Sequence, residues 1–268
     1  MAGIKSLFKD TAIYGMSSIV GRFLNWCLVP MYTYTFAAAE YGVVTNLYAY
    51  VALVLIILTY GMETGFFRFA NHDRWTDPGQ VYTTSLLSLG FTSMVFIIAA
   101  CWLSPEIAVW LDCPGNASYI WMMAIAVGVD AYTAIPFAYL RYKKKPLRFA
   151  TLRLLNIAIN IGLNLFFILA CPAIWRSNPE WIGWFYNPSF GIGYIFLANL
   201  ISSLAVLLMV VPEILAENYN FNFRLLREML RYSFPILIIG IAGIMNQTID
   251  KILYPMLVAD HTEAMTGL

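Results

Sequence analysis

Ionisable side chains occur inside long apolar stretches of this sequence. Arg22 lies near the centre of the apolar stretch 11–33, Asp130 lies within another, and Asp250 and Lys251 are adjacent in a third. A charged side chain at the centre of a membrane costs roughly 2.5 kcal/mol or more, so such a side chain faces protein or water rather than lipid. These four residues are therefore the first candidates for a functional site.

Amide side chains accompany these charges at helical spacing. Asn156, Asn160 and Asn164 follow one another at four-residue intervals, and Asn25 lies one helical turn after Arg22. Four residues turn an α-helix by about 400°, so the three later amides lie along one face of a helix. The spacing predicts a polar face rather than scattered polar residues.

Two interpretations of these polar groups are open. In the first, they are contacts between helices, in which amide hydrogen bonds are worth about 0.6 kcal/mol each and Arg22 pairs with Asp130 or Asp250. In the second, they line a water-filled cavity that receives a hydrophilic substrate. We favour the cavity, because four ionisable groups at depth are costly in a bundle with a purely structural role.

The composition excludes a water-soluble domain. The chain has 268 residues, of which 60% are hydrophobic and 12% charged, whereas soluble domains carry about 25% charged residues. A net charge of +1 gives no indication of a nucleic-acid partner. The cysteines form no CxxC pair, and no phosphate-binding loop, HExxH motif or nucleophile elbow occurs. We therefore expect neither an enzyme nor a resident cofactor or metal.

Apolar stretches of spanning length recur along the chain. A membrane helix needs about 20 apolar residues. The predicted fold class is an all-α membrane protein, a bundle of about seven transmembrane helices joined by short loops. The predicted helices are residues 11–33, 40–62, 82–103, 117–140, 149–171, 190–212 and 232–256.

The distribution of basic residues predicts the orientation of this bundle. Nearly all lysines and arginines outside the spans fall on one side, including the basic run 141–148, whereas the other side carries Arg176 alone. The positive-inside rule then places the N-terminus in the cytoplasm and the tail after the seventh helix outside. Anionic membrane lipids are expected to attract the basic loops.

Four segments carry a resemblance to a transporter family. They are LFKDTAIYGMSSIVGRFLNWCLVPMYTYTF at 7–36, EYGVVTNLYAY at 40–50, LTYGMETGFFRFAN at 58–71 and LLREMLRYSFPILIIGIAGIMNQTIDKILYP at 225–255. In this order they resemble the first helix, the start of the second helix, the end of the second helix and the seventh helix of the polysaccharide transporter family. The end of the second helix is marked by a glycine followed seven residues later by an arginine, here Gly61 and Arg68. These proteins are Wzx-type flippases of lipid-linked oligosaccharides, within the MOP (MATE-like) exporter superfamily.

The resemblance implies two six-helix lobes around a central cavity. Residues 1–215 would form the first lobe, and residues 216–268 the cytoplasmic lead-in and first helix of an incomplete second lobe. The chain is thus expected to be truncated, or to dimerise to replace the missing helices. The implied function is translocation of an undecaprenyl-diphosphate-linked oligosaccharide across the bacterial inner membrane by alternating access. Such an oligosaccharide is a repeat unit of O-antigen (the polysaccharide of lipopolysaccharide), capsule or exopolysaccharide.

The same resemblance implies cationic contacts to the substrate. Arg22 is expected to contact the diphosphate or acidic sugars, with Asn25 in the same cavity and Lys251 as a second cation. Arg68, at the cytoplasmic end of the second helix, is expected to guard the inward mouth of the cavity.

The remaining polar groups complete the expected site. Asp130 and Asp250 would be counter-ions or sites for a coupling ion, Na⁺ or H⁺. The face formed by Asn156, Asn160 and Asn164 would hydrogen-bond sugar hydroxyls. The expected partners are the lipid-linked oligosaccharide, membrane lipids, and a glycan polymerase or glycosyltransferase.

Two other functions are alternatives to the flippase. One is a MATE-like, cation-coupled exporter of drugs or metabolites, although the central Arg22 favours an anionic substrate. The other is a non-transporting membrane scaffold for glycan assembly.

Overall fold

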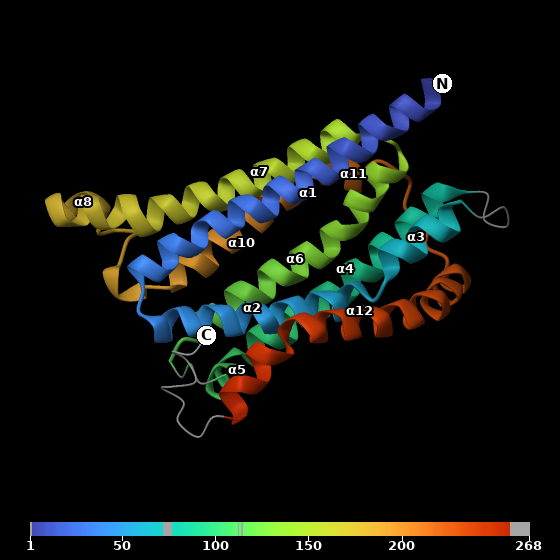
Figure 1. Ribbon diagram of the computed structural model, residues 1–268. Helices are drawn as coiled ribbons and strands as arrows, with labels where there is room; N and C mark the ends of the chain where they lie inside the picture. Colours follow the sequence, from blue (N-terminus) through green and yellow to red (C-terminus); the bar gives the residue numbers. More distant parts are fainter. Residues whose placement is uncertain (1, 72–76, 112, 114, 258–268) are drawn as a thin grey trace.

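Helices make up nearly all of the chain that the structure, a computed structural model, describes, and no strand occurs in that part (Figure 1). The described residues are 2–71, 77–111, 113 and 115–257, without the side chains at 2–14, 17–18, 22, 25 and 250–257. The elements are α1 (Ala2–Thr35), α2 (Ala38–Thr59), α3 (Met62–Ala70), α4 (Pro78–Trp102), α5 (Ser104–Trp110), α6 (Ala117–Tyr142), α7 (Pro146–Leu165), a π-turn (Phe166–Ala170), α8 (Cys171–Ser177), α9 (Pro179–Ile182), a 3₁₀ turn (Pro188–Phe190), α10 (Gly193–Met209), α11 (Val211–Ile214) and α12 (Phe223–Leu257).

Several of these helices are long and apolar enough to cross a membrane, which confirms the predicted all-α membrane class. Within the described residues, five stretches meet this condition, and α10 is a shorter apolar helix. Helix α1 covers the predicted first span. The number of spans and the division into lobes stay predictions. The five stretches are Ala38–Ala70, Pro78–Trp102, Ala117–Tyr142, Pro146–Ser177 and Phe223–Ile249.

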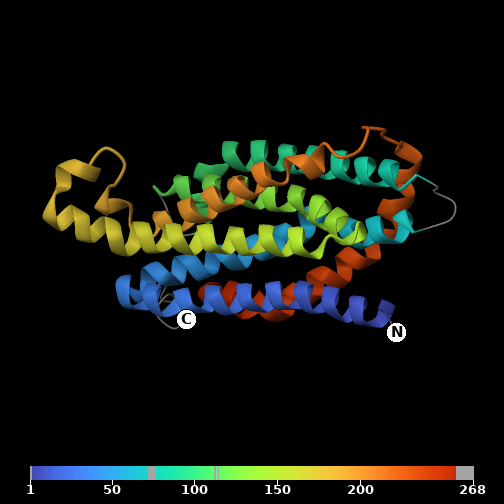
Figure 2. The ribbon, with the colours of Figure 1, turned by 90° about the horizontal axis from the view of Figure 1, so that it is seen from above.

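Helix α6 is the centre of the bundle. It packs against α4, α10, α2, α5, α3 and α7, and most of its side chains are buried. Helices α1 and α7 run side by side, and α12 packs against α2, α3 and α4. Figure 2 shows that α1 and α12 lie on the same face of the bundle, and Figure 1 places them at opposite edges of that face.

A break at the end of the predicted second span, 40–62, separates α2 from α3. Tyr60 and Gly61 both adopt left-handed backbone conformations, with φ of 33° and 68°. The chain then continues as a helix to Ala70, whereas the sequence placed the end of this span near residue 62. Glycine suits the second position because it enters the left-handed region without a steric penalty. The break directs α3 against α12.

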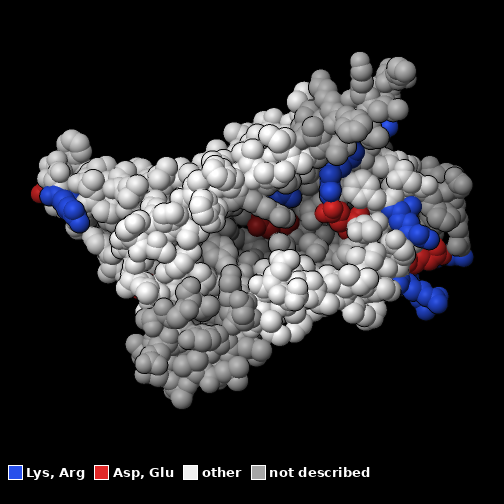
Figure 3. Space-filling model, viewed as in Figure 1, with Lys and Arg blue, Asp and Glu red and all other residues white. Residues whose placement is uncertain are grey.

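Basic side chains gather at one end of the bundle, which we call the basic end (Figure 3). This end contains the last turn of α3, the α6–α7 connection and the first turns of α12. The opposite end contains α5, α8 and α9. The described lysines and arginines at the basic end are Arg68, Arg141, Lys143, Lys144, Lys145, Arg148, Arg224, Arg227 and Arg231.

The connection between α11 and α12 is held at the basic end by Glu217. Its Oε1 atom lies 3.2 Å from Lys143 Nζ and accepts a hydrogen bond from the Tyr139 hydroxyl. The Tyr139 hydrogen bond and the Lys143 charge hold the pKa of Glu217 below its usual value. A carboxyl group whose pKa is lower in the folded state than in the unfolded state stabilises the fold at pH values above its unfolded-state pKa. This stabilisation is lost as the pH falls through the folded-state pKa.

We therefore expect Glu217→Gln to lower the thermal unfolding temperature at pH 7 and to reduce the loss of stability on acidification below about pH 4. The effect should be under about 1 kcal/mol, because the ion pair is partly exposed. Thermal unfolding in detergent between pH 3 and 7 would measure it, with the exposed Glu180→Gln at the opposite end as the control. The same pH dependence in wild type and Glu217→Gln would contradict this assignment.

Candidate functional site

Four charged side chains from three helices meet between α3, α6 and α7. Arg141 on α6 forms an ion pair with Glu63 on α3. Arg153 on α7 interacts electrostatically with Asp130 on α6, and also with Glu63 and Arg141. We call Glu63, Asp130, Arg141 and Arg153 the charge cluster. Two cations and two acids thus lie together inside a bundle of apolar helices.

The charge cluster comes from helices that border a hollow in the molecule. Figure 3 shows this hollow between the edge formed by α1 and α7 and the edge formed by α2, α3 and α12, with acidic and basic atoms at its floor. The Arg153 side chain is exposed and that of Asp130 is half-buried. The cluster is therefore open to a polar ligand, as a site for a hydrophilic substrate requires.

Asp130 is the deepest member of the charge cluster. The rise along α6 from Asp130 to Tyr142 is about 18 Å, which places it near the middle of a helix of spanning length. Its carboxylate hydrogen-bonds with Ser203 of α10. Tyr48 of α2 also lies within electrostatic reach and hydrogen-bonds with Asn199. Asp130 is therefore held by polar groups from several helices and faces the positive charge of Arg153.

Aromatic rings orient the two arginines without neutralising them. The Arg153 guanidinium carbon lies 4.2 Å from the ring centroid of Phe137 and 5.8 Å from that of Phe149. The Arg141 guanidinium carbon lies 5.3 Å from the ring centroid of Phe67. Stacking of this kind is attractive and leaves the guanidinium N–H groups free to bind oxygen atoms. The arrangement can thus present two preoriented cations to an anion.

The predicted asparagine face takes part in contacts between helices. Asn164 donates to Asn160 Oδ1 at 2.9 Å and accepts from the Tyr32 hydroxyl of α1 at 2.9 Å. Asn160 donates to Ser202 of α10 at 3.3 Å. These bonds correspond to the structural interpretation of the amides. The side-chain amide of Asn156 has no hydrogen-bond partner among the described residues. Binding of sugar hydroxyls at the three amides stays a prediction.

Removing the Tyr32 hydroxyl should weaken the contact between α1 and α7. Asn164 is 1% exposed, so Tyr32→Phe leaves its Oδ1 atom without this donor and should cost about 1 kcal/mol of unfolding free energy. Thermal unfolding in detergent would detect the loss. Tyr34→Phe is the matched control, because Tyr34 is on the same helix and is 92% exposed. Equal effects of the two substitutions would contradict the role of this bond.

Arg68 lies at the basic end, where its guanidinium carbon is 4.5 Å from the ring centroid of Tyr232 on α12. The contact joins α3 to α12. A role for Arg68 in guarding the mouth of a cavity stays a prediction.

The other predicted site residues are only partly described. Arg22 and Asn25 lie in α1, and Asp250 and Lys251 lie in α12, but their side chains are outside the described part of the structure. Their expected roles as substrate contacts and counter-ions therefore stay predictions.

Three members of the charge cluster were missed by sequence reasoning. Arg141 was assigned to a cytoplasmic loop, Arg153 fell just inside the predicted span 149–171 without a role in the site, and Glu63 was not considered. A signal for Arg153 was present, because it precedes Asn156 by three residues and so extends the same helix face toward the basic end. No comparable local pattern marks Glu63 or Arg141, whose pairing depends on how α3 meets α6.

Metal ligands do not gather in the described residues, where no group of three or more His, Cys, Asp or Glu side chains comes together. The charge cluster itself has only two carboxylates, and an arginine accompanies each of them.

One comparison with known proteins gives a match. A family model described as "Polysaccharide biosynthesis protein" matches residues 36–176, more than half of the chain. No curated protein and no solved structure matches the chain significantly. The matched stretch runs from the start of α2 to the end of α8 and contains all four residues of the charge cluster.

Proposed function

Because the chain belongs to the polysaccharide biosynthesis protein family, we propose that it is a flippase that moves an undecaprenyl-diphosphate-linked oligosaccharide across the bacterial inner membrane. The observation that carries this proposal is the charge cluster. It places two arginines on membrane-type helices that border the hollow, inside the stretch that the family model matches. A diphosphate that enters the membrane needs cations along its path, and Arg141 in the last turn of α6 and Arg153 in the first half of α7 would supply them.

Substrate binding would exchange the partners of Arg153. A phosphate offers several oxygen atoms to the planar guanidinium fork, and such charge-assisted bonds are about twice as strong as neutral ones. The diphosphate would replace Asp130 as the partner of Arg153, with Arg141 available as a second cation. The saccharide would occupy the hollow, while the polyprenyl tail would stay in the surrounding lipid.

The exchange also suggests how transport could be coupled to an ion gradient. When Arg153 turns to the diphosphate, Asp130 loses its counter-ion and becomes a site for H⁺ or Na⁺. Binding of this ion would compensate the charge of Asp130 in a low-dielectric setting. The basic end would face the cytoplasm, as the positive-inside rule requires, and alternating access would open the hollow to each side in turn.

The remaining predicted residues keep their proposed roles in this mechanism. Arg22, Asn25 and Lys251 would add contacts to the diphosphate or acidic sugars from α1 and α12, and Asp250 would be a further counter-ion. A glycan polymerase or glycosyltransferase would be the protein partner that uses or supplies the substrate.

The test is Arg153→Gln in cells whose surface glycan depends on this protein. We expect surface glycan to fall by roughly 10- to 100-fold and lipid-linked oligosaccharide to accumulate, because one charge-assisted contact is worth about 1.5–3 kcal/mol. Arg153→Lys should restore part of the export, since it keeps the charge and loses the fork. The control is Arg176→Gln, a basic residue in α8 at the opposite end.

Normal surface glycan in Arg153→Gln, at equal protein levels, would overturn the proposal. If such cells were instead more sensitive to cationic drugs, the protein would be a drug exporter. If glycan were unchanged in Arg153→Gln and in Arg22→Ala but lost on deletion of the gene, the protein would be a scaffold.

A further inference from the structure

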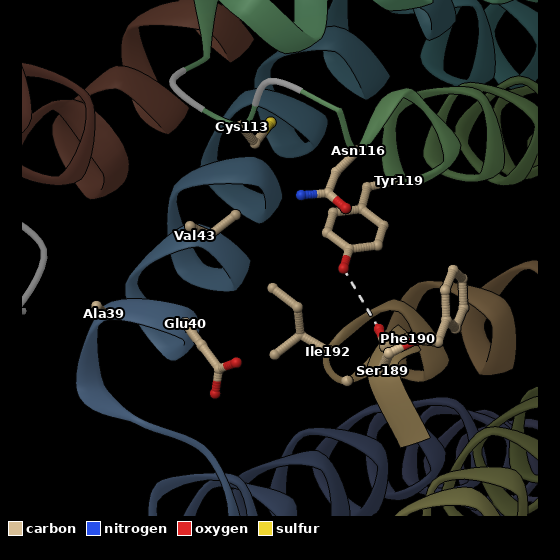
Figure 4. Close-up of a pocket in the computed structure, with 10 residues that line it drawn as sticks. Ala39, Glu40, Val43, Cys113, Asn116, Tyr119, Ser189, Phe190 and Ile192 are labelled. Atoms are coloured by element: carbon tan, nitrogen blue, oxygen red, sulfur yellow. Dashed lines mark hydrogen bonds between the residues drawn. The ribbon is translucent and has the colours of Figure 1, made fainter. Parts of the chain in front are cut away.

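A separate cavity with mixed polar and apolar lining lies at the opposite end of the bundle from the basic residues. It has a volume of about 360 Å³ and lies between the start of α2, the segment that leads into α6, and the segment before α10. This volume is within the range of small-ligand sites. Figure 4 shows its lining, to which Glu40, Asn116, Tyr119 and Phe190 contribute polar or aromatic groups.

Several polar atoms in this cavity have bonding capacity left for a ligand. Glu40 accepts one bond, from the Ala37 backbone N–H to its Oε2 atom at 3.1 Å, so Oε1 is available. The side-chain amide of Asn116 has no hydrogen-bond partner among the described residues. The Tyr119 hydroxyl donates to the Phe190 carbonyl at 3.3 Å and can still accept a bond. Figure 4 shows Glu40 and Asn116 pointing toward the same space from α2 and from the start of α6.

The charge of this cavity separates it from the charge cluster. Among the described residues that line it there is no lysine or arginine, and Glu40 is the one carboxylate. A diphosphate would therefore be repelled. The Glu40 carboxylate can accept hydrogen bonds from vicinal hydroxyl groups of a sugar, and the Asn116 amide can both donate to and accept from hydroxyl and acetamido groups. The Tyr119 and Phe190 rings add apolar surface for the C–H face of a sugar ring. This combination fits a pyranose ring.

We propose that this cavity is a saccharide subsite, which binds one sugar residue of the head group at the opposite end of the bundle. The inference rests on the proposed flippase function, because it supplies the reason for a sugar to arrive there. The two sites divide the recognition by chemistry: the charge cluster holds the anionic diphosphate, and the Glu40 cavity holds a neutral sugar.

Binding can be measured without transport, by saturation-transfer NMR on the purified chain in detergent. The probes are glucose, galactose, N-acetylglucosamine and glucosamine at millimolar concentration. We expect at least one neutral probe to bind, and Glu40→Gln to weaken its binding by about tenfold, because a charge-assisted bond becomes a neutral one. Glu40→Gln keeps an acceptor for the Ala37 N–H, so the start of α2 is preserved.

Asn116→Ala is a second test from the other wall of the cavity and should weaken binding by a similar factor. The control is Glu106→Gln on α5, an exposed carboxylate at the same end outside the cavity, which should bind sugars as wild type does.

Three results would overturn the subsite: no saturation transfer to any probe, transfer to glucosamine alone, or unchanged binding in both cavity variants. None of these results bears on export through Arg153, so the failure of the subsite and the failure of the flippase proposal are distinguishable.

Discussion

Asp130→Asn is expected to destabilise the protein more than Arg153→Gln does, although both substitutions disrupt the same interaction. Without Asp130, the cluster holds two arginines and one glutamate, and an arginine cannot release its proton. Without Arg153, Asp130 can bind a proton and become neutral. We expect Asp130→Asn to cost about 1–3 kcal/mol, less than a fully buried pair would lose, because the hollow admits water to Arg153. Thermal unfolding in lipid nanodiscs would measure the loss.

The double variant Asp130→Asn/Arg153→Gln separates the interaction from the effects of the single changes. Removing both charges should recover most of the loss caused by Asp130→Asn, with a coupling energy of about 1 kcal/mol or more. The matched control is the partly exposed i,i+4 pair Arg224 and Glu228 on α12, whose charged atoms are 3.9 Å apart and should couple by no more than about 0.5 kcal/mol. Additive effects at Asp130 and Arg153 would show that the two charges do not interact.

Gly65→Val is expected to separate α12 from α3. A Cβ atom at Gly65 would lie 2.6 Å from Ser233 Oγ of α12, and Ser233 is fully buried. Overpacking of this kind costs about 1–3 kcal/mol, and valine adds two further methyl groups. The nearby stack of Arg68 on Tyr232 should be lost as well. Cross-linking of cysteines placed at 68 and 232, in a background without the native cysteines, would report the separation.

Two further variants show whether the close contact is the cause. Gly65→Ala should have a smaller effect, and Gly65→Ala/Ser233→Gly should restore part of the cross-linking by removing the clashing oxygen. Gly243→Ala, on α12 with no atom within 4 Å of the added Cβ, should leave α12 in place and even stabilise its helix slightly. Unchanged cross-linking in Gly65→Val would contradict the close packing of α3 on α12.

The sequence alone determined the class of the protein and the approximate helices. Long apolar stretches such as 82–103 and 117–140 coincide with α4 and α6, because a membrane segment must satisfy its own backbone hydrogen bonds and therefore forms a helix. Asp130 was found in the same way, since a charge within an apolar stretch is visible without any knowledge of its neighbours. The basic end followed from the positions of lysine and arginine relative to the predicted spans.

The tertiary structure decided how polar groups are partnered. Asn160 and Asn164 share a helix face with Asn156, which periodicity predicted, but only packing showed that Tyr32 and Ser202 bond two of the three. The partners lie on α1 and α10, far away in the sequence. Spacing along one helix gives the direction of a side chain, whereas its partner depends on how neighbouring helices cross.

The charge cluster and the Glu40 cavity also needed the tertiary structure. Glu63 reaches Arg141 because the left-handed break at Tyr60 and Gly61 gives α3 a direction that apolar periodicity does not encode. Glu40 and Asn116 come together from the start of α2 and the start of α6. The sequence determined which residues are costly to bury, because that cost is local to each residue. The tertiary structure decided which of them share a site, because electrostatic interactions act between helices and fall off with distance.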